Sequence, residues 1–142
     1  MKKIYALLFV TILMAFGCAS DNEKPSADSL LYTEALNSIN SIISAYGEKN
    51  IKSLRKLTAP NLSEDIVKNL FFKKADVSFV VKIVRIKGSS VIVDLNWKGE
   101  WQLENDGKIE NRGVASLVLN KETMVLLNID GDNPFIVPAS MY

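Results

Sequence analysis

The chain of 142 residues carries 17 Lys and Arg against 16 Asp and Glu, a formal net charge of +1, and 48% of its residues are hydrophobic. This composition is too apolar for a disordered chain and too neutral for a typical nucleic-acid-binding protein. The sequence has no His and a single Cys. It therefore excludes His-based metal sites, Ser-His and Cys-His catalytic pairs, Cys-only zinc sites and an intramolecular disulfide.

The amino terminus has the layout of a secretory signal. Lys2 and Lys3 precede an uncharged run, Ile4–Phe16, and Gly17 stands directly before Cys18. As a helix this run is roughly 20 Å long. A helix that spans a bilayer has roughly 20 residues and is longer than this run. The alternative interpretation is a permanent transmembrane anchor.

The segment Ala15-Phe16-Gly17-Cys18 resembles the bacterial lipobox. The resemblance implies cleavage before Cys18 and a thioether-linked diacylglycerol on its sulfur. Each buried methylene contributes about 0.8 kcal/mol, so two or three acyl chains would hold the domain on a membrane. Asp is absent from the second mature position, Ala19, which favours the outer over the inner membrane, with the domain facing the periplasm. The alternative is a cleaved signal followed by an incidental Cys.

We therefore divide the chain into a signal peptide (1–17), a lipidated Cys with a flexible polar tether (18–29) and a folded domain (30–138). Removal of residues 1–17 takes away Lys2 and Lys3 and no acid, so the net charge becomes −1. No electrostatic attraction to nucleic acid is expected.

Helical spacing of apolar residues predicts three helices at the start of the domain. The first is expected over 31–46 and ends at Gly47. The second follows a cap at Asn50, and Pro60 is expected to end that segment. The third is expected to begin near Ser63, with acids in its first turn and an apolar face of Ile66, Val67, Leu70 and Phe71.

Beyond Lys74 the hydrophobic period changes to two, which predicts antiparallel strands over 77–87, 91–103, 112–120 and 123–130. Asn105-Asp106-Gly107 is a strong hairpin signal, because Asp and Gly tolerate a positive φ. Further turns are expected at Gly88-Ser89 and Lys121-Glu122.

The strand 91–103 would extend roughly 43 Å, which is longer than a domain of this size is wide. It must therefore bend, and Gly99, between Trp97 and Trp101, is where a bend is least obstructed. The predicted fold is α+β, with the amino-terminal helices packed in the concave face of a strongly bent antiparallel sheet meander.

These features resemble the nuclear transport factor 2-like superfamily, also called cystatin-like or ketosteroid-isomerase-like. The resemblance rests on a long first helix ending at Ala45-Tyr46-Gly47, a short helix Asn50–Leu57 followed by Thr58-Ala59-Pro60, long bent strands and the closing segment Leu127–Phe135. It covers nearly all of residues 30–136. The alternative is a different small α+β meander with its helices on one face.

The resemblance implies no single function, since this fold serves isomerases, cyclases, hydrolases, secretion-system parts and binding modules. An enzyme of this kind would be expected to place ionisable groups inside the cone, as ketosteroid isomerase does. Here the cone-facing register is apolar, and Asp94, Glu100 and Glu104 are interpreted as solvated charges on the opposite face. Tyr32 and Tyr46 could reach the interior, more simply as core residues.

Other polar clusters are also interpreted structurally. Asp130, Asp132 and Asn133 do not match the spacing of a calcium loop and indicate a turn. A local basic excess is interpreted as a solvated strand edge rather than a phosphate or peptidoglycan site; it comprises Lys73, Lys74, Lys82, Arg85 and Lys87.

Trp97 and Trp101 are either packed core or the wall of an apolar pocket in the cone. The candidate pocket residues are Tyr46, Val93, Leu95, Trp97 and Trp101.

The sequence thus predicts a lipid-anchored cell-envelope protein with no catalytic set, no metal and no cofactor. The favoured function is a small-ligand-binding or protein-interaction module, using the cone interior for an apolar ligand or the convex sheet face for an envelope protein. Similar proteins also form sheet-to-sheet homodimers. The alternatives are an isomerase- or hydrolase-type enzyme, which needs a buried carboxylate of raised pKa, and a subunit of a secretion or envelope complex, which needs an exposed apolar patch.

Overall fold

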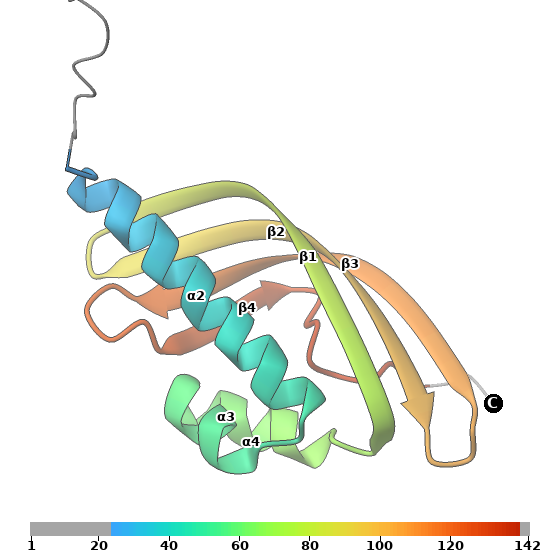
Figure 1. The fold of residues 1–142 in the computed structure, drawn as a ribbon. Helices are drawn as coiled ribbons and strands as arrows, with labels where there is room; N and C mark the ends of the chain where they lie inside the picture. Colours follow the sequence, from blue (N-terminus) through green and yellow to red (C-terminus); the bar gives the residue numbers. More distant parts are fainter. Residues whose placement is uncertain (1–23, 140–142) are drawn as a thin grey trace, which may run out of the picture.

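The computed structural model describes residues 24–139, so the signal segment, Cys18 and the first part of the tether lie outside the described residues. Three helices precede four strands within this part of the chain. Figure 1 shows α2 (Ala27–Gly47), α3 (Ile51–Leu57), α4 (Pro60–Lys68), β1 (Phe72–Lys87), β2 (Ser90–Leu103), β3 (Lys108–Asn120) and β4 (Leu126–Gly131).

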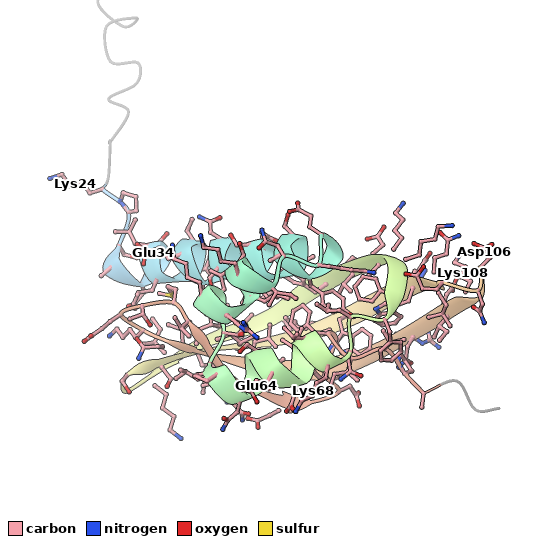
Figure 2. The ribbon with its side chains drawn as sticks, turned by 90° about the horizontal axis from the view of Figure 1, so that it is seen from below. Lys24, Glu34, Glu64, Lys68, Asp106 and Lys108 are labelled. Carbon is pink, nitrogen blue, oxygen red and sulfur yellow. The ribbon has the colours of Figure 1, made fainter. Side chains whose placement is uncertain are left out.

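The strands form one antiparallel sheet in the order β1-β2-β3-β4, so each strand pairs with its neighbour in sequence. The sheet is curved, and α2 runs across its concave side with α3 and α4 near the carboxyl end of that helix (Figure 1). This confirms the predicted α+β meander. In the view from below, Lys24 lies at one end of the molecule, and Asp106 and Lys108 of the β2–β3 hairpin lie at the other (Figure 2).

The helix starts follow from their capping residues. Ser26 accepts a hydrogen bond on Oγ from the backbone N–H of Ser29 at 3.1 Å, so α2 begins at Ala27, earlier than expected. Residues 27–29, which were assigned to the tether, are therefore helical. Asn50 caps α3 as expected, accepting from the N–H of Ser53 at 3.1 Å.

The prediction for α4 was wrong at both ends. Pro60 opens this helix rather than ending the previous segment, because proline lacks the N–H that a first helical position leaves unpaired. Glu64 therefore lies beyond the first turn. Phe71 lies outside the helix and is 55% exposed, whereas its neighbour Phe72 begins β1 and is fully buried.

The strands also differ from expectation at their ends. β1 and β3 begin earlier than predicted because their pairing with β2 continues to Phe72↔Leu103 and Gln102↔Lys108. β4 begins later, at Leu126, because Met124 has a positive φ of 54° that ends the preceding turn. The β1–β2 pairing shifts between Val81 and Ile83, where β1 contains one extra residue.

The core lies between α2 and the concave face of the sheet. The inward-facing residues of β2 pack there as predicted, alongside the buried face of α2 and two aromatic residues from β1 and the closing segment. These residues are Val91, Val93, Leu95, Trp97 and Trp101 from β2, Ala35, Ile39, Ile42 and Tyr46 from α2, with Phe72 and Phe135. Over residues 24–139, no helix is both long and apolar enough to cross a membrane.

Candidate functional site

The cone interior brings together all five candidate pocket residues. Tyr46, Val93, Leu95, Trp97 and Trp101 are each at most 4% exposed. Trp101 Nε1 donates a hydrogen bond to the Tyr46 hydroxyl at 2.8 Å, and Trp97 Nε1 donates to the backbone carbonyl of Asp132 at 2.8 Å. Both indole N–H groups therefore have partners inside the protein.

Aromatic packing fills this interior. The Tyr46 ring lies 5.0 Å from that of Phe72 and 5.4 Å from that of Phe135, and the two Trp rings meet edge to face at 6.3 Å. The enclosed space left between α2 and the sheet is about 10 Å³. That is roughly the room a single water needs, so the interior space beside Leu95 and Trp97 is too small for a ligand.

Two glycines leave room for the tryptophan rings on the inner face of the sheet. A Cβ on Gly99 would overlap the ring of Trp101, and one on Gly113 would lie 2.9 Å from Trp97 Cε2. Gly113 is directly opposite Trp97 on the neighbouring strand. The inner face is thus built around the two indole rings, for which these glycines leave room.

The interior offers no acid–base pair. Burial raises the pKa of Tyr46 to about 12, against the opposing effect of the hydrogen bond from Trp101. No Asp, Glu, Lys or Arg of residues 24–139 is buried. Tyr32 is 44% exposed and does not reach the interior. Tyr46 is consequently a neutral phenol with no carboxylate beside it.

The closing loop is held by its own polar side chains. Asp132 Oδ2 accepts a hydrogen bond from the backbone N–H of Val114 at 3.2 Å, and Asn133 Oδ1 accepts one from the N–H of Phe135 at 2.9 Å. Asp130 accepts from the side-chain amide of Asn128 at 2.7 Å. The described part of the chain contains no group of three or more His, Cys, Asp or Glu placed to hold a metal ion.

The outer face of the sheet, which points away from the helices, carries exposed apolar side chains. Val80, Asn96 and Val114 form one row across β1, β2 and β3, and the two valines are 62% and 61% exposed. Ile83, in the next row opposite Asp94, is 56% exposed. We call Val80, Ile83 and Val114 the apolar patch.

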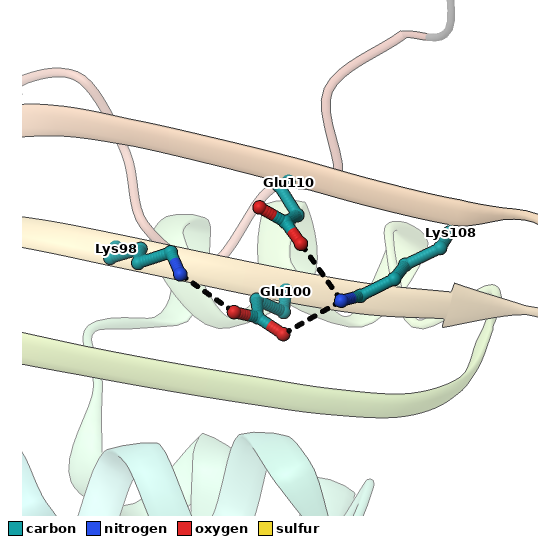
Figure 3. Close-up of polar contacts among 4 residues, drawn as sticks. All are labelled: Lys98, Glu100, Lys108 and Glu110. Carbon is teal, nitrogen blue, oxygen red and sulfur yellow. Dashed lines mark hydrogen bonds and ion pairs between the residues drawn. The ribbon is translucent and has the colours of Figure 1, made fainter.

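Charged rows separate the apolar patch from the β2–β3 hairpin. Glu100 is bound by Lys98 at 2.7 Å and by Lys108 at 3.2 Å, and Lys108 also contacts Glu110 at 2.8 Å (Figure 3). Hydrogen bonds from Lys98 and Lys108 lower the pKa of Glu100. These groups are solvated and neutralise one another, as expected for charges on the outward face.

A polar hollow of about 410 Å³ lies beside this cluster. It is lined by Lys74, Asp76, Glu100, Trp101, Gln102, Asp106 and Lys108. Its charges are of mixed sign, so it does not define an anion or cation site.

The basic residues that were predicted to lie on a strand edge do lie there, because all of them are on β1, an edge strand of the sheet. Arg85 contacts Asp94 at 2.8 Å and Lys73 contacts Asp106 at 3.3 Å. The pKa of Asp94 is lowered by the hydrogen bond from Ser116 and further by Arg85. Glu104, on the hairpin, lies 3.7 Å from Lys49.

An apolar groove of about 550 Å³ lies at the hairpin end and was not predicted from the sequence. It is lined mainly by Phe71, Leu103, Ile109, Pro138 and Ala139, with Glu104 and Asn105 at the hairpin. Phe71 had been expected in the core, so no exposed aromatic was expected here. The apolar patch was missed as well, although the run Phe79–Val84 departs from strict alternation and so places apolar residues on both faces.

The comparisons agree with this architecture. No protein-family model matches the chain, and no curated protein matches its sequence. Among solved structures, the chain is similar to a nuclear transport factor 2-like superfamily protein from Salmonella enterica serovar Typhimurium, with 12% identity, a TM-score of 0.63, and coverage of 81% of this chain and 97% of the other. It is also similar to a conserved protein from Planctomyces limnophilus, with 10% identity, a TM-score of 0.53, and coverage of 75% and 98%.

The described domain therefore has the nuclear transport factor 2-like fold.

Proposed function

We propose that this chain is a non-catalytic interaction module of the cell envelope, and that its outer sheet face binds a protein partner. The observation that carries the proposal is the apolar patch, in which Val80, Ile83 and Val114 are 62%, 56% and 61% exposed on β1 and β3. Burial of such side chains contributes about 25 cal/mol per Å² of apolar area, and a partner surface would supply that burial.

The interior supports this choice over catalysis or internal ligand binding. Its enclosed space is about 10 Å³, and its one buried ionisable group is Tyr46, within the described residues. General acid–base catalysis needs a positioned proton donor or acceptor, and no Asp, Glu, Lys or Arg of residues 24–139 is buried in the interior beside Tyr46. A subunit of a secretion or envelope complex would use the same outer face. The apolar patch supports that kind of partner as well.

We also propose that acyl chains on Cys18 hold the domain at a membrane, with the outer membrane favoured and the domain in the periplasm. The support is the order of Lys2 and Lys3, the uncharged run Ile4–Phe16 and the lipobox-like Ala15-Phe16-Gly17-Cys18. A soluble domain held at a surface meets membrane partners at raised local concentration, which suits a small patch of modest affinity.

A second candidate function is binding of a small apolar ligand. The groove beside Phe71, Leu103 and Ile109 favours it, because its volume of about 550 Å³ is in the range of ligand sites. Native mass spectrometry of the protein purified from an envelope extract tests this candidate: a mass excess lost on denaturation supports it, and an unliganded spectrum contradicts it.

Site-specific photo-crosslinking in cells tests the outer face. A photoreactive residue is placed at Val114 of the full chain, and a matched residue at Leu30, an exposed apolar position on α2 that is 51% exposed. We expect an adduct from position 114 and none from position 30. Equal adducts at both positions, or none at 114, would contradict the proposal.

A further inference from the structure

We infer that the open edge of β3 at the hairpin end binds an extended segment of a partner protein, which adds to the sheet as a further strand. The site is an edge of the sheet and not its outer face, so the inference goes beyond the proposed function. It rests on three features of this edge: its free backbone groups, the apolar groove on its inner side and the charges on its outer side.

β3 is longer than the strand that covers its outer edge. It spans Lys108–Asn120, whereas β4 pairs with it only over residues 115–119. One further bond continues this line, in which the backbone N–H of Asp132 donates to the carbonyl of Val114 at 2.9 Å. Figure 1 shows β4 beside only the half of β3 that lies away from the hairpin. Within the part of the chain that the structure describes, residues 108–112 therefore have no neighbouring strand on this side.

The alternation of the strand determines which backbone groups are free here. Val114 directs its carbonyl and its N–H toward Asp132, whose carboxylate accepts from that N–H at 3.2 Å. Every second residue of a strand points the same way, so the N–H and C=O groups of Glu110 and Arg112 also point away from β2. Both residues are exposed, and no hydrogen bond among residues 24–139 joins these groups to a partner on that side. An extended peptide can bond to all of them.

The apolar groove lies on the inner side of this edge. Its volume is about 550 Å³, and Ile109, Pro138 and Ala139 contribute to its wall. Ile109 pairs with the buried Trp101, so its side chain belongs to the inner face of the sheet. Residues directly opposite each other on neighbouring strands share one face. A residue of the added strand opposite Ile109 therefore points into the groove, which favours an apolar side chain.

The outer side of the edge favours a carboxylate on the partner. Lys98 and Arg112 lie directly opposite each other on β2 and β3, and like charges in that arrangement repel. Lys98 binds Glu100 at 2.7 Å, whereas Arg112 has no ion-pair partner among the described residues. A hollow of about 280 Å³ lies beside them and is lined by Lys98, Glu110, Asn111 and Arg112. An acid opposite Arg112 would enter this hollow and pair with the guanidinium.

These contacts define the chemistry of the partner segment. The added strand takes the direction of β4, antiparallel to β3, so the residue opposite Arg112 comes three positions before the residue opposite Ile109. The segment is therefore extended and carries an Asp or Glu, two further residues and then an apolar residue. Charged side chains on an edge strand oppose unselective pairing, so the required acid also gives specificity.

Selection of peptides on the full chain tests the site. The probe is a library of random octapeptides displayed on phage. We expect the enriched peptides to share an acid three positions before an apolar residue. No enrichment, or enriched peptides that lack this spacing, would overturn the inference.

Two substitutions at Glu110 separate its backbone from its side chain. Glu110→Pro and Glu110→Ala both remove the carboxylate, but only proline removes the N–H, and edge strands tolerate proline where the N–H points outward. We expect proline to weaken binding of an enriched peptide by about tenfold and alanine to leave it nearly unchanged. Thermal unfolding of both variants checks that the fold is kept. Equal binding by the two variants would contradict strand addition.

The contact with Arg112 is tested by exchanging the signs of the charges. Arg112→Glu should weaken the enriched peptide by about tenfold, and a peptide with Lys in place of its acid should restore binding to that variant. The control is Arg55→Glu, an equal charge reversal at an exposed position of α3, which should leave binding unchanged. If the exchanged pair failed to bind, the proposed register would be wrong.

The outcomes also separate this inference from the functions proposed above. A photo-adduct at Val114 without any enriched peptide would overturn the added strand while leaving a partner on the outer face. A mass excess in native mass spectrometry without any enriched peptide would assign the groove to a small ligand and overturn the added strand as well. Enriched peptides with the expected spacing and no photo-adduct would support the edge site and contradict the outer-face proposal.

Discussion

Trp101 donates the hydrogen bond of its indole N–H to the hydroxyl of Tyr46, at 2.8 Å, across a sequence separation of 55 residues. Both side chains are fully buried. The bond joins α2 to β2 at the centre of the core. Without it, the Trp101 N–H and the Tyr46 hydroxyl would be unpaired polar groups in an apolar interior.

Removal of the Tyr46 hydroxyl should therefore destabilise the fold. Tyr46→Phe keeps the ring but leaves the Trp101 N–H unpaired, and we expect the free energy of unfolding to fall by about 1–3 kcal/mol. Urea unfolding followed by tryptophan fluorescence measures this change.

The matched control is Tyr32→Phe, because Tyr32 is 44% exposed on the same helix. Its effect should stay within about 0.5 kcal/mol. Similar losses in the two variants would show that the buried hydrogen bond does not carry the effect.

The same tyrosine should make stability sensitive to alkaline pH. Its pKa is about 12 in the folded protein and 10.0 is the ordinary value, so the folded state holds its proton more tightly. Its contribution is complete below pH 10 and is lost as the pH rises through 12. We expect a loss of up to about 3 kcal/mol over that range.

Comparison with Tyr46→Phe isolates this contribution, since other groups titrate similarly in both proteins. The difference in unfolding free energy between the two should shrink from pH 10 to 12, measured at several pH values. A difference that stays constant would contradict the raised pKa.

Gly113→Ala should destabilise the sheet. The added Cβ would lie 2.6 Å from Asp132 Cβ and 2.9 Å from Trp97 Cε2, so the ring or the closing loop must move. We expect a loss of about 1–3 kcal/mol in thermal or urea unfolding.

Gly47→Ala provides the control, because its added Cβ would meet only the carbonyl oxygen of Ala75, at an ordinary 3.5 Å. Gly47 is the last residue of α2 and has no positive φ. Alanine there should be neutral or slightly stabilising. If Gly47→Ala proved the more damaging of the two, the packing argument for Gly113 would fail.

Cys18→Ser tests the membrane anchor. Without the sulfur no thioether can form, so cells should accumulate a full-length precursor that takes up no labelled fatty acid. Labelling of the unchanged chain in parallel is the positive control. Uptake by Cys18→Ser equal to that of the unchanged chain would disprove lipidation at this residue.

The architecture was predictable because β2 alternates almost without exception. Apolar residues from Val91 to Trp101 share one face, and the polar residues between them share the other. Such a long strand has to curve, and α2 supplies the apolar stripe that fills the concave side. Local patterns therefore determine both which face is buried and which elements cover it.

The ends of elements and the packed state of the interior could not be predicted in the same way. Pro60 can end one segment or open the next helix, and the choice depends on where Ala59 lies in the fold. The interior space beside Trp97 is only about 10 Å³, and Phe135, from the far end of the chain, lines that same space. Tertiary contacts of this kind leave no trace in local periodicity.

The meander order of the sheet has a consequence for folding kinetics. Each hairpin can form from neighbouring segments, whereas the bond from Ser38 Oγ to the carbonyl of Met124 joins residues 86 apart. Closing that long loop costs chain entropy that only late contacts offset, so α2 should dock on a sheet that is already paired. Ser38→Ala should then speed unfolding while leaving the refolding rate nearly unchanged, and stopped-flow measurements that find slower refolding instead would place the helix in the folding nucleus.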